Sequence, residues 1–129
     1  MKKLLLIFFV TVLITGCSNQ NSENNCVEQE VSFITEVRAP HSGIVNKKIE
    51  IEVSFNIKNG CGKFLGFEES NTLNSKIIKV NTIYEGCVCT EIFEMKTVIY
   101  NFTATEAGIY ELKFLKGENE YIVVMITIV

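Results

Sequence analysis

Cysteine offers the most chemistry in this chain, because a thiol can be acylated, oxidised to a disulfide or used as a soft metal ligand. The five cysteines are Cys17, Cys26, Cys61, Cys87 and Cys89. His41 is the single histidine, and no Asp is present among the fifteen acidic residues. This composition excludes a two-histidine metal site, EF-hand loops, Asp dyads and the usual Ser-His-Asp triad.

The first cysteine follows a segment organised like an export signal. Two lysines after Met1 precede an uncharged apolar stretch, residues 4–15, which is shorter than the about 20 residues that a membrane-spanning helix needs. The following Ile14-Thr15-Gly16-Cys17 resembles a bacterial lipobox. That resemblance implies Sec export, a diacylglycerol on the Cys17 thiol, further acylation such as palmitate, and cleavage between Gly16 and Cys17. The alternative is an ordinary signal peptide beside an unrelated cysteine.

The lipobox divides the chain into three parts: a signal peptide (1–16), the lipidated cysteine with a polar Asn-rich linker (17–26), and a domain (27–129). Two or three acyl chains, at ~0.8 kcal/mol per buried methylene, anchor a protein durably. Loss of two of the twelve basic residues with the signal leaves ten against fifteen acidic ones, a net charge of −5. Such a domain is a poor nucleic-acid binder. We therefore expect a cell-envelope protein on the inner or outer membrane, facing the periplasm or the surface.

In the domain itself, apolar and polar residues alternate with a period of two, which is the period of a β-strand. Residues 49–58 are apolar at odd and polar at even positions, which predicts one buried and one solvated face. On the solvated face, Glu50 and Glu52 either pair with lysines of other strands (Lys79 or Lys96) or stay hydrated. Further apolar runs separated by turn residues bring the expected number to about seven strands, at 31–37, 49–58, 64–67, 78–84, 98–102, 110–114 and 121–129. Phe64, Leu65 and Phe67 are expected to fill the core rather than to stack on a ligand.

The four remaining cysteines favour two disulfides in an exported protein, with three connectivities open. If strand direction reverses at each turn, Cys26, Cys61, Cys87 and Cys89 reach the same end of the domain. We expect Cys61 to bridge one residue of the Cys87/Cys89 pair and Cys26 the other. The alternatives are a Zn or Cu site that uses Cys61, Cys87 and Cys89, or a redox pair formed by Cys87 and Cys89. The loops 38–46, 70–75 and 104–108 are then expected at the opposite, outward-facing end, where a protein partner would bind.

One segment resembles a known family. Residues 107–114, Ala-Gly-Ile-Tyr-Glu-Leu-Lys-Phe, are similar to the start of the penultimate strand in immunoglobulin-like domains, where the tyrosine forms a corner. The resemblance implies an antiparallel Ig-like or fibronectin-like β-sandwich. With its lipobox and linker, the chain resembles small lipoproteins of the Bacteroidota. We expect a non-catalytic binding or structural module without a cofactor. The alternatives are a metal-handling or thiol-redox protein and a hydrolase around His41.

Overall fold

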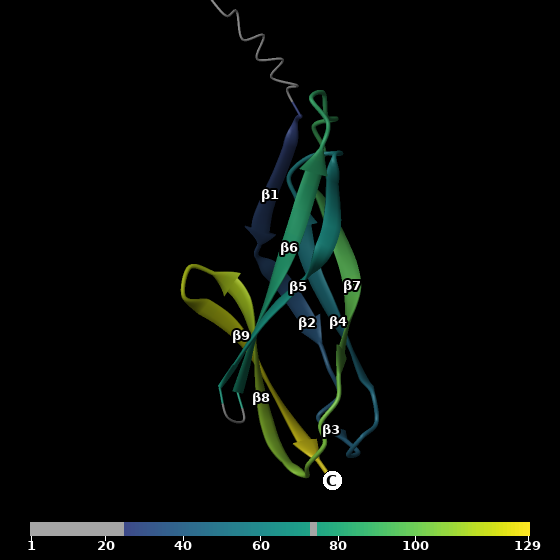
Figure 1. Cartoon of the computed structure of the whole chain (residues 1–129), viewed down its shortest axis with the longest axis vertical. Helices are drawn as coiled ribbons and strands as arrows, with labels where there is room; N and C mark the ends of the chain where they lie inside the picture. Colours follow the sequence, from purple (N-terminus) through teal and green to yellow (C-terminus); the bar gives the residue numbers. More distant parts are fainter. Residues whose placement is uncertain (1–24, 73–74) are drawn as a thin grey trace, which may run out of the picture.

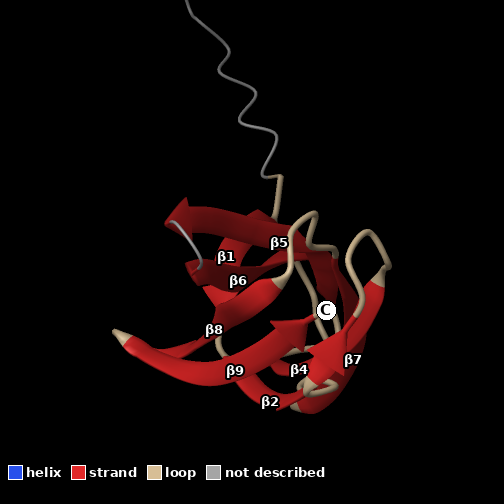
Figure 2. Ribbon diagram, turned by 90° about the horizontal axis from the view of Figure 1, so that it is seen from below, coloured by secondary structure: helices blue, strands red, loops and turns tan. Residues whose placement is uncertain are grey.

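The computed structural model describes residues 25–72 and 75–129, which form nine β-strands in two layers (Figures 1 and 2). The strands are β1 (Val27–Ser32), β2 (Ile34–Arg38), β3 (Ser42–Gly43), β4 (Ile49–Ile57), β5 (Gly62–Thr72), β6 (Ser75–Glu85), β7 (Glu94–Phe102), β8 (Gly108–Gly117) and β9 (Glu120–Ile128). Sheet A holds β1, β6, β8, β9 and β3 in that order, with β5 also paired to β6; sheet B holds β2, β4 and β7. The predicted β-sandwich is confirmed. No helix in these two ranges is long and apolar enough to cross a membrane.

Strand β6 organises sheet A. Strand β5 pairs with it antiparallel from one end to the other, whereas β1 and β8 pair with different halves of β6. The expectation of a purely antiparallel sandwich is wrong here, because β8 runs parallel to β6 and β3 runs parallel to β9. The physical reason is the path of the chain. Strand β7 lies between β6 and β8 in sequence but belongs to sheet B, so β6 and β8 run the same way and become neighbours.

The number and lengths of the strands also differ from the seven expected. The segment 31–37 is split at Phe33, which is 50% exposed between two buried neighbours, Ser32 and Ile34. The chain passes there from sheet A to sheet B. Strand β5 spans eleven residues instead of four, because its backbone stays paired with β6 through a polar stretch, 68–72, that has no apolar alternation.

The core lies between the sheets and is built by the inward positions of the strands. In β4, Ile51, Val53 and Phe55 are fully buried. The opposing sheet contributes large apolar side chains from β6, β8 and β9. Thr82 is a buried polar exception whose hydroxyl hydrogen-bonds that of Ser32 at 2.8 Å. Because this pair satisfies itself, the strands stay packed without an orphaned polar group.

A row of aromatic rings joins the two sheets on the flank between β5 and β7. Phe67 packs edge-on against Tyr100, with ring centroids 5.1 Å apart, and Phe64 stands 4.9 Å from Phe67. The prediction that this segment fills the core holds for Phe67, which packs against the buried cluster. It is wrong for Leu65, which is 47% exposed, because the register of β5 shifts between Phe64 and Gly66.

Candidate functional site

The four cysteines of the described chain lie together at one end of the sandwich, which we call the cysteine pole. Cys26 pairs with Cys87 and Cys61 with Cys89, with Cα–Cα distances of 4.9 and 5.4 Å. Two bridges at one end are what the sequence predicts, and the structure selects one of the connectivities left open. No group of three or more His, Cys or Glu side chains that could hold a metal ion is found in residues 25–72 and 75–129.

The turn that carries Cys87 and Cys89 depends on Gly86. Its φ of 140° is unfavourable for a residue with a side chain, and its amide donates to the carbonyl of Cys26 at 2.8 Å. A Cβ at this position would lie 2.9 Å from the Sγ of Cys61. The close approach of backbone to sulfur therefore brings both disulfides to the same short turn.

The first strand begins at Val27, directly after Cys26. Gly16 and Cys17, the expected cleavage and lipidation residues, lie outside the described residues. The expected signal peptide (1–16) and all but the last two residues of the expected linker (17–26) lie outside them as well.

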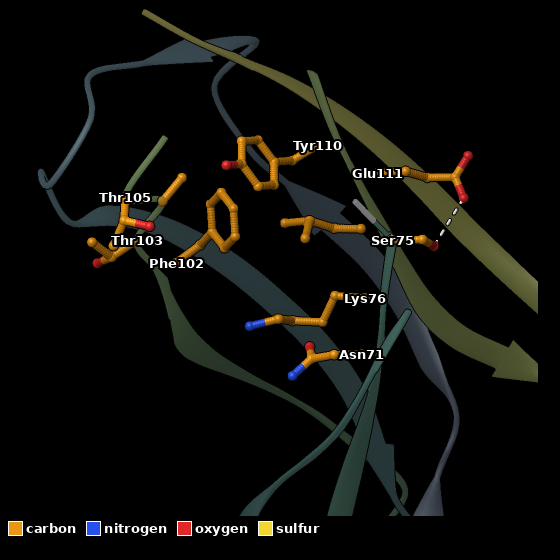
Figure 3. A pocket seen from close by; sticks show the side chains of 10 residues that line it. Asn71, Ser75, Lys76, Phe102, Thr103, Thr105, Tyr110 and Glu111 are labelled. Atoms are coloured by element: carbon orange, nitrogen blue, oxygen red, sulfur yellow. Dashed lines mark hydrogen bonds between the residues drawn. The ribbon is translucent and has the colours of Figure 1, made fainter. Parts of the chain in front are cut away.

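The described residues of the three loops expected at the opposite end lie near one another. The amide of Asn46, in the β3–β4 connection, donates to the carbonyl of Ala104 in the β7–β8 loop at 2.8 Å. The same β7–β8 loop and the β5–β6 hairpin line a pocket of about 340 Å³, which we call the distal pocket (Figure 3). Its walls are Asn71, Ser75 and Lys76, then 102–105, then 110–112. This volume is at the lower end of the range for sites that bind small ligands.

Lys76 is the cation of the distal pocket. Its side chain is 25% exposed, its ammonium lies 5.8 Å from the centre of the Phe102 ring, and its ion pair with Glu69 is long, at 3.5 Å. Figure 3 shows the Asn71 amide beside it, and the Glu111 carboxylate extending in the opposite direction. The pocket therefore presents an ammonium and an amide next to an aromatic wall.

Glu111 lines the distal pocket, but its carboxylate is directed away from Lys76 (Figure 3). Hydrogen bonds from Lys113 and from the hydroxyl of Ser75, which lies at 3.1 Å, lower the pKa of its carboxyl. Because Lys113 and Ser75 already neutralise and solvate this carboxylate, it opposes an anionic ligand at Lys76 less than a free carboxylate would.

Tyr110 forms the corner that the sequence resemblance implies. Its hydroxyl donates to the carbonyl of Glu106 at 2.8 Å, and its ring packs against Phe102 with centroids 5.5 Å apart. The corner fixes the β7–β8 loop, which is the wall of the distal pocket that carries Thr103 and Thr105.

The other residues weighed from the sequence have ordinary surroundings. His41 is exposed, and its carbonyl accepts from the amide of Thr127 at 3.0 Å. Glu50 pairs with Lys48 at 3.0 Å, and both side chains are 59% exposed. The two lysines expected as cross-strand partners of Glu50 and Glu52 pair elsewhere: Lys79 with Glu68 and Lys96 with Glu94.

The comparisons with known proteins identify the domain. The family model described as "ORF11 beta-sandwich domain" matches residues 51–126, which is more than half of the chain. The chain belongs to the ORF11 β-sandwich domain family. No curated protein and no solved structure shows a significant match to it.

The matched part of this ORF11 domain extends from β4 into β9. It includes the distal pocket, the cysteines of the β6–β7 turn and Cys61, but not Cys26. Lys76 was not predicted as a site residue, although the sequence carries a signal for it. Lys76 has the same parity as the buried Ile78 and Val80, so it stands on the inward face of β6, where an ammonium must lie near an opening or a partner.

Proposed function

We propose that this ORF11 domain is a non-catalytic binding module of the bacterial cell envelope, exported as a lipoprotein and held to a membrane through Cys17. The likeness of the N-terminal segment to a lipobox supports the tether. The small Ig-like sandwich then stands as a rigid body on the polar linker, in the manner of small lipoproteins of the Bacteroidota.

The observation that supports the binding role is that the N-terminal connection and the distal pocket lie at opposite ends of the domain. Both disulfides lie where β1 begins, so the chain continues toward Cys17 from the cysteine pole. The β7–β8 loop, which lines the distal pocket, lies toward the other end of the sandwich (Figure 1). A tethered domain of this shape directs the loops around 104–108 away from the membrane, where a partner protein can reach them.

The chemistry of the distal pocket favours a partner segment that carries a carboxylate. Lys76 offers the charge, Asn71 and Thr105 offer hydrogen-bond donors, and Phe102 offers an apolar wall. The Lys76 ammonium has three donor hydrogens, and its contact with the Glu69 carboxylate is long, at 3.5 Å. The ammonium can therefore also bind a second anion. A charge-assisted hydrogen bond of this kind is stronger than one between neutral groups.

The binding role is tested by photo-crosslinking in the native host. A benzoylphenylalanine at Thr105, on the rim of the pocket, is compared with one at Ile99, which is 45% exposed on the outer face of sheet B. We expect a crosslinked product from Thr105 only. The product should be lost with Lys76→Ala and kept with Lys79→Ala, a control on the same strand outside the pocket. Equal crosslinking from Thr105 and Ile99, or none from Thr105, contradicts the proposal.

The tether and the thiol alternative are tested on the same protein. Metabolic labelling with an alkyne palmitate should mark the chain, and Cys17→Ser should abolish the label. Alkylation without reductant should then modify none of the four remaining cysteines. Reactive thiols at Cys61, Cys87 and Cys89, or a native mass heavier by a metal ion, would favour the metal-handling or redox function instead.

A further inference from the structure

The cysteine pole exposes apolar side chains that the domain leaves uncovered. Val88 is 94% exposed and Phe93 is 76% exposed, both in the loop between β6 and β7. Three further apolar side chains at this end are also exposed: Val27 at the start of β1 (53%), Ile92 in the loop (42%) and Met95 in β7 (55%). Exposed apolar side chains also occur elsewhere on the described residues, but Val88 and Phe93 are the two most exposed of the large ones and lie in the same loop. Such a concentration of apolar surface indicates an interaction surface.

The two disulfides hold this loop in place. Val88 lies between Cys87, which is bonded to Cys26, and Cys89, which is bonded to Cys61. The amide of Gly60 also donates to the carbonyl of Thr90 at 2.8 Å. Because the loop is fixed to two other segments, Val88 cannot fold back onto the core, and its exposure is built into the fold.

The position of the tether identifies what covers this surface. Cys26 is nine residues beyond Cys17 and is bonded to Cys87, one residue before Val88. At about 3.5 Å per residue, nine residues reach no farther than about 32 Å even when fully extended. A lipid on Cys17 therefore keeps Cys26, and with it the disulfide-bonded β6–β7 loop, within about 32 Å of the bilayer surface.

The charges of the pole favour zwitterionic lipid. Glu91 lies in the loop itself, and two further carboxylates flank it, Glu85 paired with Lys63 at 3.5 Å and Glu94 paired with Lys96 at 3.2 Å. These groups give the pole no excess of basic charge that would attract anionic headgroups. Apolar side chains then supply the attraction, entering about 5–10 Å into the boundary between headgroups and acyl chains.

We infer that the β6–β7 loop, residues 86–93, seats Val88 and Phe93 in the interface of the membrane that anchors the domain. This inference rests on the proposed lipid tether. It adds a second, apolar contact that orients the sandwich upright, with the distal pocket directed away from the membrane. An acyl chain with a nine-residue connection could not fix that orientation alone.

The chain has no tryptophan, so a single introduced one reports on its own surroundings. The acylated full-length Val88→Trp protein is reconstituted into phosphatidylcholine–phosphatidylethanolamine vesicles, with and without brominated acyl chains. We expect its fluorescence to shift to the blue and to be quenched by the brominated lipid. The control is Ile109→Trp, 59% exposed at the start of β8 near the opposite end, which should show neither change.

Mass measurement of each preparation separates the tether from the loop contact. An acylated Val88→Trp protein that is not quenched overturns the inference and leaves the tether intact, whereas a chain without an acyl group contradicts the proposed function. A blue shift that depends on protein concentration and not on bromine means contact with a second copy, which also overturns the inference. Adding Phe93→Glu to Val88→Trp should reduce the quenching of an equally acylated protein, and unchanged quenching would contradict the role of Phe93.

Discussion

The hydroxyl of Tyr100 donates a hydrogen bond to the carboxylate of Glu69 at 2.5 Å, and this bond connects β7 of sheet B to β5 of sheet A. Glu69 also pairs with Lys76, the cation of the distal pocket. The ring of Tyr100 packs between Phe67 and Phe114, with centroids 5.1 and 5.9 Å away. One buried phenol therefore stabilises the flank of the sandwich and fixes the carboxylate that holds Lys76.

Tyr100→Phe should test this connection, because it removes the hydrogen bond and keeps the ring. We expect the free energy of unfolding to fall by about 1.5–3 kcal/mol, the usual net value for a hydrogen bond to a charged group. Urea denaturation measures it. The matched control is Tyr121→Phe, a half-exposed position on β9, which should change stability by less than about 0.5 kcal/mol. Equal effects of the two variants would contradict a specific role for Glu69.

The same bond makes stability depend on alkaline pH. Burial of the phenol, together with its hydrogen bond to Glu69 and the negative charge of that carboxylate, raises the pKa of Tyr100 well above its usual value. Below pH ~10 the phenol is protonated in both folded and unfolded chains, and its contribution is complete. Above that pH only the unfolded chain releases the proton, so stability falls as the pH rises.

Urea unfolding of wild type and Tyr100→Phe between pH 9 and 11.5 measures this contribution. The wild-type advantage should shrink above pH ~10 by about 1.4 kcal/mol per pH unit, the value for one proton. A constant difference across this window would mean that the Tyr100 phenol ionises as readily in the folded protein as in the unfolded one.

The disulfides should contribute unequally. Cys26 and Cys87 are 61 residues apart in sequence, whereas Cys61 and Cys89 are 28 apart. In the chain-entropy model, opening the longer loop costs about 4.3 kcal/mol and the shorter about 3.6 kcal/mol. We expect the double variant Cys26→Ser/Cys87→Ser to be the less stable of the two paired double variants in urea. The reverse order would show that native-state packing around Cys61 outweighs loop length.

Much of the fold follows from the sequence because burial imposes a period of two. Most of strand β4 is predicted correctly, since Ile51 and Val53 face the core while Glu50 and Glu52 face solvent. The exception is Ser54, which was expected on the solvated face but is buried, with its hydroxyl hydrogen-bonded to that of Thr97. The common position of the four cysteines follows from counting chain reversals. Strands that are held by backbone pairing alone need no alternation of apolar and polar residues. For that reason the polar second half of β5 and the two-residue β3 were not predicted.

The site was predictable only in part. The sequence indicates which loops share an end, because loops between consecutive strands alternate between the two ends. It does not indicate that Lys76 contacts Phe102 or that Glu69 accepts from Tyr100, because these contacts join sheet A to sheet B and depend on how the two sheets pack. The parallel pairing of β6 with β8 has the same origin: which strands become neighbours across a sheet is a tertiary property, absent from local periodicity.

Gly86→Ala should interfere with the disulfides themselves. The φ of 140° at Gly86 lies in a region that residues with a side chain rarely adopt, and a Cβ there would stand 2.9 Å from the Sγ of Cys61. Relief of both conflicts requires the turn to move away from Cys61, which separates Cys89 from its partner. We expect a loss of stability of roughly 1–3 kcal/mol and a fraction of molecules with two alkylatable thiols.

Gly66→Ala is the control for Gly86→Ala, because a Cβ at Gly66 meets nothing within 4 Å. Two measurements distinguish the variants: the intact mass after alkylation without reductant counts the free thiols, and urea denaturation measures the stability. Gly66→Ala should keep both bridges and near-wild-type stability. If Gly86→Ala also formed both bridges in full and matched Gly66→Ala in urea, the turn would tolerate a side chain. Its left-handed conformation would then not be what brings the two disulfides together around Val88.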